Sequence, residues 1–266
     1  MRLDPRDRGL AYGDGVFETL RITAAGEAPL WPRHLARLQA GLQALGIPAP
    51  APSCLQGALA SAIGALAGRQ GVVKMTVTRG VGGRGYLPPS RVTPTLFVQH
   101  GDLPQWSRVQ REQGIELGVC QTVLHPDLLA GYKHLNRLPQ VQARREVARY
   151  GWDEGLLLSP RQQPLEATSM NLFVRFEDHW WTPDLARAGA GVAGVMRDVL
   201  QEKLVAQGMR VCSDLRPLSQ LRHAEALFLC NSVVGVLPVR KLAQWHWPVT
   251  AELAALQAQA EQLFHQ

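Results

Sequence analysis

The chain has 266 residues, of which 46% are hydrophobic, and a formal net charge of +6. This length suffices for one large domain or two smaller ones. No apolar run approaches the roughly 20 residues of a membrane-spanning helix, and the first residues lack the apolar core of a signal peptide. We therefore expect a globular protein that stays in the cytoplasm.

The four cysteines are widely separated, and no histidine stands near them at metal-ligand spacing. They predict neither a zinc site nor a disulfide framework, and we expect no bound metal. Cys120 and Cys230 lie in strand-like runs, which indicates buried apolar side chains.

The positive charge comes from 24 Arg and only four Lys. The Arg residues are spread along the chain, with no run longer than Arg144–Arg145, and this is not typical of a nucleic-acid-binding surface. A modest positive field equally suits a small anionic substrate. Because Arg serves almost everywhere as the cation, a Lys in an unusual setting indicates a role for its amine.

Residues 1–104 are expected to form an N-terminal α+β domain, since strands and helices occur there in separate runs. The apolar pattern predicts, in chain order, a strand at 15–22, a short strand ending near Trp31, helices at 33–45 and 53–67, and strands at 72–79 and 95–99.

Residues 105–130 are expected to form a connector with one strand at 115–122, and residues 131–266 a C-terminal domain. The elements predicted for that domain are a helix at 138–150, strands at 154–158 and 171–176, a hairpin across 178–179, a helix at 195–207, strands at 226–229 and 235–239, and a helix at 250–264.

The stretch VTRGVGGRGY at residues 77–86 has the glycine spacing of a dinucleotide-binding loop. Such a loop must lead directly into a helix, whose N-terminus holds the pyrophosphate. Pro88 and Pro89 follow instead and disfavour a helix. We therefore reject the dinucleotide-binding interpretation.

Two side chains stand out as candidates for chemistry. Lys133 lies between a loop and the start of a helix, and Glu166 stands directly before a strand. Considered alone, each has an ordinary alternative, an exposed surface lysine and a solvated turn carboxylate respectively.

A candidate anion site lies at residues 189–194, where glycines lead into a helix N-terminus. A close-packing turn is the alternative. Ser232, after an apolar strand, adds a hydroxyl that could bind the same anion or only cap the strand end. Arg37 lies on the first long helix, where most arginines are solvated.

Taken together, these segments resemble the class-IV (fold type IV) pyridoxal-phosphate enzymes. The resemblance covers about residues 10 to 240 and is carried by YGDGVFET at 12–19, HLARL at 34–38, KHLNRL at 133–138, Glu166 with NLF at 171–173, and GVAGVMR at 191–197. It implies an α+β, two-domain, D-amino-acid aminotransferase-like architecture. The smaller N-terminal α/β domain would precede a larger C-terminal domain with a mixed-sheet, barrel-like core.

The resemblance also implies roles for the candidates. Lys133 would hold pyridoxal 5'-phosphate through a Schiff base and act as the acid–base group. Glu166 would pair with the pyridine nitrogen. The groups implied to hold the phosphate are Arg37, the backbone amides near Val195 and Met196, and Ser232, while Phe17 and Thr19 would line the substrate side.

Residues 131–138 and 79–86 look most like the lyase branch of this family. That branch implies a carbon–oxygen lyase that converts 4-amino-4-deoxychorismate to 4-aminobenzoate and pyruvate for folate biosynthesis. Arg84 and Tyr86 are then the candidates to meet a substrate carboxylate, and Arg79 is a weaker one. One departure is Thr168-Ser169-Met170, which should adjust the site wall without removing catalytic groups.

The resemblance further implies a homodimer, with each active site between the two domains and touched by a loop of the partner. An alternative function is a pyridoxal-phosphate-dependent aminotransferase acting on branched-chain or D-amino acids, which would use the same Lys133 and Glu166. A third interpretation is a non-catalytic protein that binds anions or nucleic acid through the Arg surplus.

Overall fold

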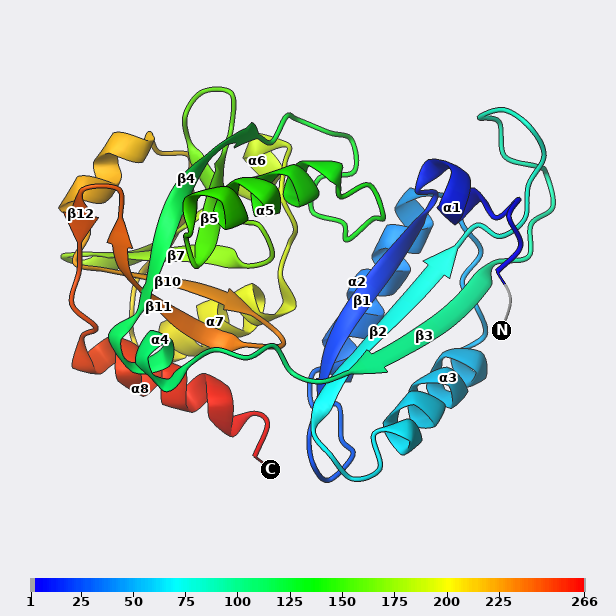
Figure 1. The fold of residues 1–266 in the computed structure, drawn as a ribbon, viewed down its shortest axis with the longest axis horizontal. Helices are drawn as coiled ribbons and strands as arrows, with labels where there is room; N and C mark the ends of the chain where they lie inside the picture. The colour runs from blue at the N-terminus through cyan, green and yellow to red at the C-terminus, as the bar shows by residue number, and fades with distance from the viewer. Residues whose placement is uncertain (1–2, 266) are drawn as a thin grey trace. The chain divides into compact units, whose positions relative to one another are not determined.

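The structure is a computed structural model that describes residues 3–265. Residues 1, 2 and 266, with which the two expected domains begin and end, lie outside the described residues. The chain divides into two compact units (Figure 1). Unit 1 comprises Met1–Leu103 and Tyr132–Asn136, and unit 2 comprises Pro104–Gly131 and Arg137–Gln266.

Unit 1 is built on a three-stranded antiparallel sheet with the order β1-β2-β3. Its elements are α1 (Arg8–Tyr12), β1 (Gly15–Ile22), α2 (Trp31–Ala44), α3 (Pro52–Ala65), β2 (Gly71–Thr78) and β3 (Thr95–Gly101). Alternate residues of β1, such as Val16 and Leu20, share one core with Leu38 of α2 and Leu55 of α3. Both long helices therefore cover the same face of the sheet.

The short strand expected to end near Trp31 is wrong. Residues 23–27 form a turn in which the Thr23 N–H donates to the Glu27 carbonyl at 2.9 Å, and Trp31 is already the first residue of α2. Pro32 explains the early start, because its fixed φ and missing N–H suit the first turn of a helix.

The stretch at residues 77–86 contains no helix. Strand β2 ends at Thr78, and no helix follows before β3 begins at Thr95. The described residues therefore lack the helix that a dinucleotide-binding loop requires after its glycines, as the sequence predicted.

Unit 2 contains a closed six-stranded barrel. Strands β10-β11-β4-β5-β6-β7 are neighbours in that order, and an antiparallel pairing of β10 with β7 closes the ring. The six strands are β4 (Ile115–Val123), β5 (Glu154–Leu158), β6 (Pro164–Ala167), β7 (Asn171–Phe176), β10 (Ala226–Asn231) and β11 (Gly235–Leu242). The pairs β11–β4 and β4–β5 are parallel and the others antiparallel, so the expected mixed, barrel-like core is confirmed.

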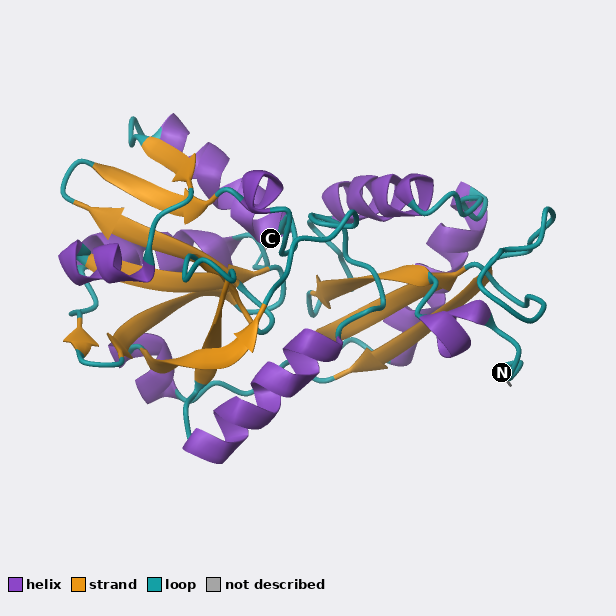
Figure 2. Ribbon diagram, turned by 90° about the horizontal axis from the view of Figure 1, so that it is seen from above, coloured by secondary structure: helices purple, strands orange, loops and turns teal. Residues whose placement is uncertain are grey.

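Further strands and helices extend the barrel, and Figure 2 shows strands inside each unit with helices outside them. These elements are α4 (Arg108–Gln113), α5 (Leu138–Tyr150), β8 (His179–Pro183), α6 (Leu185–Ala188), α7 (Val195–Ala206), β9 (Val211–Asp214), the 3-10 helix η1 (Leu218–His223), β12 (Trp245–His246) and α8 (Ala251–Gln262). No helix among residues 3–265 has the length and apolar character to cross a membrane.

The barrel interior is filled by aliphatic side chains, including Leu117, Leu172 and Leu237, each at most 1% exposed. Cys120 and Cys230 are buried, as expected. Burial raises the pKa of the Cys120 thiol to about 12, so this side chain remains protonated and serves as packing.

Candidate active site

In unit 1, Lys133 lies along the open edge of β1. The Phe17 N–H donates to the Lys133 carbonyl at 2.9 Å, and the Leu135 N–H donates to the Gly15 carbonyl at 3.0 Å. These bonds flank an isolated antiparallel bridge between Val16 and His134, which holds residues 133–135 beside β1. The Lys133 ammonium lies 4.5 Å from the centre of the Phe17 ring, so backbone pairing brings together two residues that the family resemblance assigns to the active site.

A second lysine, missed by the sequence analysis, shares this ring. The Lys74 ammonium lies 4.7 Å from the centre of the Phe17 ring, and Lys74 stands opposite Thr19 in the β1–β2 register. Phe17 and Thr19 lie on one face of β1, because they are two residues apart. The rarity of lysine, which drew attention to Lys133, applied equally to Lys74.

Arg37 belongs to a buried network rather than to the solvated surface. Its Nε and Nη2 donate to the two Glu18 carboxylate oxygens at 2.8 and 2.6 Å. His34 Nδ1 lies 2.6 Å from Glu18 Oε2. Burial alone would raise the pKa of Glu18, but the hydrogen bonds from Arg37 and His34 outweigh it and lower that pKa to about 2.

The loop after β2 carries the other predicted substrate residues of unit 1. Arg84 is exposed and Tyr86 is 86% exposed. Arg8 anchors the loop by donating to the carbonyls of Gly85 at 3.1 Å and Tyr86 at 2.7 Å. Arg8 thus fixes the backbone of this loop at Gly85 and Tyr86, while the Arg84 and Tyr86 side chains are exposed to solvent.

Arg79, the weaker candidate, has a structural role. Its guanidinium donates to both Asp14 carboxylate oxygens, at 2.7 and 3.0 Å, and to the carbonyls of Leu45 and Gly46 at the end of α2. These contacts tie the end of β2 to the end of α2, which accounts for a buried arginine here.

In unit 2, Glu166 lies on β6 and is 5% exposed. Its Oε2 accepts from the Val192 N–H at 2.8 Å, and its Oε1 accepts from Gln140 Nε2 at 3.4 Å. The first bond fixes the carboxylate against the glycine loop. Gln140, on the first turn of α5, was not identified from the sequence.

The glycine loop, residues 189–194, depends on two glycines. Gly191 has a φ of +91°, a conformation that side chains other than glycine rarely adopt. A Cβ added to Gly194 would lie 1.8 Å from Asn171 Oδ1. Asn171 Nδ2 donates to the Val192 carbonyl at 2.9 Å, so the loop is packed tightly on β7.

Helix α7 begins directly after this loop. Gly194 is its N-cap, and Val195 and Met196 are its first residues. Both side chains are buried, so the two residues present backbone N–H groups at the helix N-terminus, where an anion is favoured. These features are consistent with the predicted anion site. The loop is also closely packed, so the two interpretations of residues 189–194 do not exclude each other.

Ser232 lies in the β10–β11 turn and is half-buried. Its neighbour Asn231 accepts from the N–H groups of Val233 and Val234 at 2.9 and 2.7 Å. The strand-end capping considered for Ser232 is thus carried out by Asn231.

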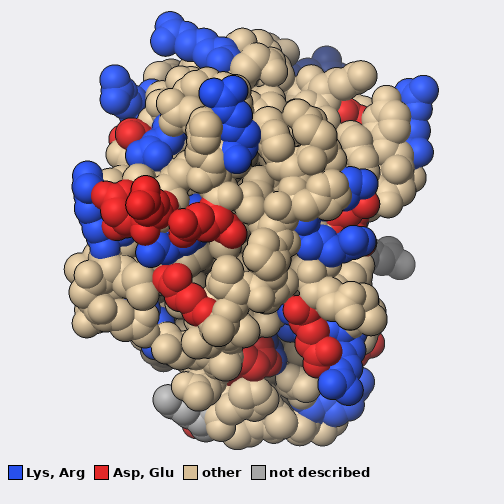
Figure 3. Space-filling view, turned by 90° about the vertical axis from the view of Figure 1, so that its left-hand side faces the viewer, with Lys and Arg blue, Asp and Glu red and all other residues tan. Residues whose placement is uncertain are grey.

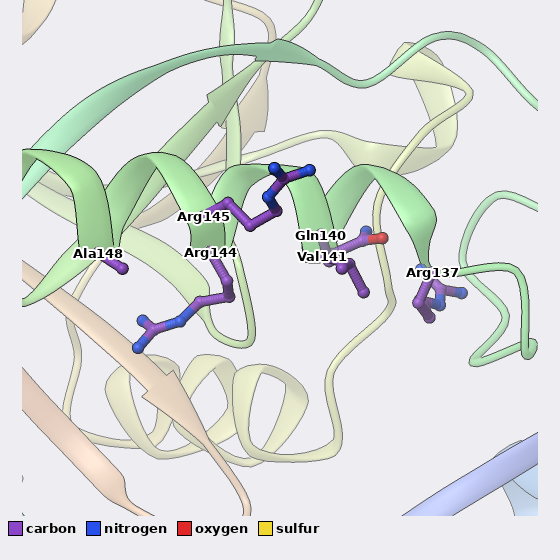
Figure 4. Close-up of a pocket in the computed structure, with 6 residues that line it drawn as sticks. All are labelled: Arg137, Gln140, Val141, Arg144, Arg145 and Ala148. Atoms are coloured by element: carbon purple, nitrogen blue, oxygen red, sulfur yellow. The ribbon is translucent and has the colours of Figure 1, made fainter.

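A shallow cavity of about 420 Å³ lies along α5 (Figure 4). Its lining residues all come from the helix or its N-cap, and they are Arg137, Gln140, Val141, Arg144, Arg145 and Ala148. Of these residues, Gln140 donates to Glu166, as described above. The cavity contains none of the residues predicted from the sequence.

Charge on the surface is mixed. On the face shown in Figure 3, Lys and Arg side chains are interspersed with Asp and Glu. Arg8 and Arg79 are buried in ion pairs with Asp14. No group of three or more His, Cys, Asp or Glu side chains among the described residues could hold a metal ion.

Comparison with known proteins gives consistent results. The sequence matches the family described as Amino-transferase class IV over residues 15–242. It is 35% identical to an aminodeoxychorismate lyase of Vibrio harveyi over 88% of this chain and 84% of that protein. It is 29% identical to a putative branched-chain-amino-acid aminotransferase of Methanocaldococcus jannaschii, over 88% of this chain and 80% of that protein.

Among solved structures, the chain is similar to the 4-amino-4-deoxychorismate lyase of Pseudomonas aeruginosa. The TM-score is 0.91 at 41% sequence identity, and the match covers 98% of this chain and 95% of the other.

Proposed function

The chain belongs to the class IV aminotransferase family, and from this premise we propose that it is a pyridoxal-phosphate-dependent aminodeoxychorismate lyase. It converts 4-amino-4-deoxychorismate to 4-aminobenzoate and pyruvate, a reaction of folate biosynthesis. The observation that carries this function is the 41% identity with a lyase over 98% of the chain. The 35% identity with a second lyase supports it.

The residues of unit 2 fit the cofactor. The glycine loop and the N-terminus of α7 offer backbone N–H groups suited to a phosphate. An added Cβ at Gly194 would meet Asn171, so the loop is shaped at that point for glycine alone. An ionised Glu166 can only accept hydrogen bonds, which suits a protonated ring nitrogen.

When bound, the cofactor withdraws the electron pair left behind as a proton departs from the carbon that bears the substrate amine. Lys133 is the residue that would bind it covalently through Nζ. Once released, the same Nζ accepts the proton from that carbon. The bond between the ring carbon and the enolpyruvyl oxygen breaks, a proton is added to the released enolpyruvate to give pyruvate, and the ring becomes aromatic, which makes the elimination effectively irreversible.

Other side chains of this chain orient the reacting groups. Glu166 would hold the proton at the ring nitrogen, and its bond from the Val192 N–H keeps its carboxylate in place. The substrate has two carboxylates, which need cations aimed at them. Lys74 supplies positive charge beside Thr19, and Arg84 is exposed for the same purpose.

We propose further that the enzyme acts as a homodimer in the cytoplasm. Light scattering of the purified holoenzyme tests the assembly, because a dimer doubles the mass of the 29.2 kDa chain.

The proposed function is tested by reduction with borohydride followed by mass mapping. A pyridoxyl group on Lys133 is expected, and its absence would contradict the assignment of Lys133. The non-catalytic interpretation predicts no covalent cofactor and strongly salt-dependent binding of polyanions instead.

An aminotransferase is the second candidate, favoured by the 29% identity with the Methanocaldococcus protein. Release of 4-aminobenzoate and pyruvate from 4-amino-4-deoxychorismate is measured beside amino transfer to 2-oxoglutarate. Strong transfer without lyase product would overturn the lyase proposal in favour of this second candidate.

A further inference from the structure

Glu18 is a carboxylate on the buried, apolar face of strand β1. It stands between Val16 and Leu20 on the face of β1 that packs on the helices, and it is 1% exposed. Removing a carboxylate from water is unfavourable unless charged and hydrogen-bonding partners surround it. Its partners therefore indicate what this buried charge does.

Both partners come from α2 and are one turn apart. Arg37 pairs with both carboxylate oxygens through Nε and Nη2, and its side chain is 13% exposed. His34 is 1% exposed and lies 2.6 Å from Oε2 through Nδ1. A bidentate pair fixes both the plane and the rotation of the guanidinium group.

His34 is neutral in this network. Burial lowers its pKa, and the nearby charges of Arg37 and Lys133 act in the same direction against the opposing effect of Glu18. Because an ionised carboxylate only accepts, the hydrogen on the neutral ring is on Nδ1 and is donated to Glu18. Nε2 then carries a lone pair, and it is buried without a hydrogen-bond partner among the described residues.

We propose that Glu18 is a positioning residue, which together with His34 holds the Arg37 guanidinium in the orientation that binds the cofactor phosphate. This inference rests on the proposed function. The Glu18 charge already balances that of Arg37, so the contribution of Arg37 is a set of directed N–H donors rather than net charge. A phosphate monoester is an acceptor suited to those N–H groups of the fixed guanidinium that do not point at Glu18.

The role of Glu18 is separable from general stability by comparing two ligands. Pyridoxal 5'-phosphate and pyridoxal differ only in the phosphate, and both can react with Lys133. Their dissociation constants are measured by absorbance titration of the apo form of the full chain. We expect Glu18→Gln to weaken pyridoxal 5'-phosphate binding about 10- to 100-fold, the range for losing a charged hydrogen bond, and to change pyridoxal binding less than about twofold.

Two further variants complete the design. Glu18→Asp keeps the charge and should restore part of the lost affinity for the phosphate ligand. Glu116→Gln is the matched control, because Glu116 is also paired with a cation, Lys241 at 2.8 Å, but lies in unit 2; both affinities should stay unchanged. If Glu18→Gln does not fold, His34→Phe replaces it, since this variant keeps the Glu18–Arg37 pair and a ring of similar size but removes the Nδ1 donor to Glu18.

The outcomes separate this inference from the proposed function. A loss confined to pyridoxal 5'-phosphate supports positioning of Arg37. An equal loss for both ligands, or no loss for either, in Glu18→Gln or its His34→Phe replacement overturns it. Failure of the unaltered protein to bind either ligand would instead contradict the proposed function.

Discussion

The two units present their candidate cofactor groups in different ways. Unit 1 uses charged side chains held by other side chains, as Glu18 holds Arg37. Unit 2 uses backbone N–H groups held by glycine conformation and by Asn171. The orientation of a charge held by side chains depends on the protonation of its partners. The position of a backbone N–H donor depends instead on there being no side chain at the glycines of the loop. The two units should therefore respond to different perturbations.

The largest effect is expected where unit 1 contributes an amine. Lys133→Arg keeps the positive charge but cannot form the covalent bond, because a guanidinium does not replace an amine in Schiff-base chemistry. We expect the rate of 4-aminobenzoate release to fall at least about 10³-fold, within the range for losing a general acid–base group. Lys203→Arg, on α7, is the matched control, and a Lys133→Arg enzyme with the rate of this control would contradict the role.

A steric change should have the next largest effect, and it belongs to unit 2. Gly194→Ala places a Cβ 1.8 Å from Asn171 Oδ1, so the glycine loop must shift. Overpacking of this kind destabilises a protein by about 1–3 kcal/mol, and displacement of the α7 N-terminus should also weaken binding of pyridoxal 5'-phosphate. Urea unfolding and cofactor titration measure the two effects.

The control for this steric change is Gly57→Ala. Gly57 lies within α3, where an added Cβ would meet nothing within 4 Å. Replacing a helical glycine by alanine there should stabilise the fold by up to about 1 kcal/mol. Equal behaviour of the two variants would show that the glycine loop tolerates a side chain.

The same contrast explains what could be predicted from the sequence. The glycine loop could be recognised from the sequence, because a backbone with positive φ at position 191 favours glycine there. The Glu18 network was not identified, because a charged residue in a strand normally faces water. The only signal was the two-residue spacing of Glu18 from Val16 and from Leu20, which places its carboxylate on the apolar face of the strand.

The fold shows the same limits. Long periodic helices such as α2 and α5 were predicted within a few residues, while α1, β6 and β9 have too few residues to show a period. Closure of the barrel joins β7 to β10, which are separated by 49 residues between Phe176 and Ala226. No local pattern specifies such a pairing, so the barrel was expected from the family resemblance alone.

Acid should affect the unit 1 network in two stages. The pKa of His34 is lowered from its ordinary 6.5, so the unfolded chain binds a proton more readily and stability falls as the pH drops below about 6.5. Glu18 has a pKa of about 2 instead of 4.5. Its contribution is therefore complete above pH 4.5 and is lost as the pH falls towards 2.

Urea unfolding at pH 7.5, 5.5 and 4 tests this order. His34→Asn should remove the part of the pH dependence that begins near 6.5, and Glu18→Gln the part below 4.5. Gly57→Ala, which alters no ionisable group, should follow the unaltered protein. A His34→Asn profile parallel to that of the unaltered protein would show that His34 titrates normally.

The smallest effect is expected from a unit 1 charge that no side chain holds. The Arg84 side chain is exposed and makes no hydrogen bond or ion pair with the described residues, in contrast to Arg37. Because an exposed, unconstrained cation contributes weakly, Arg84→Ala should leave the covalent cofactor on Lys133 intact and raise the KM for 4-amino-4-deoxychorismate only about fivefold. Arg91→Ala, an exposed arginine of the same segment, should leave KM unchanged. A rise in KM of about 10-fold or more in Arg84→Ala would contradict a weak contribution from this exposed, unconstrained cation.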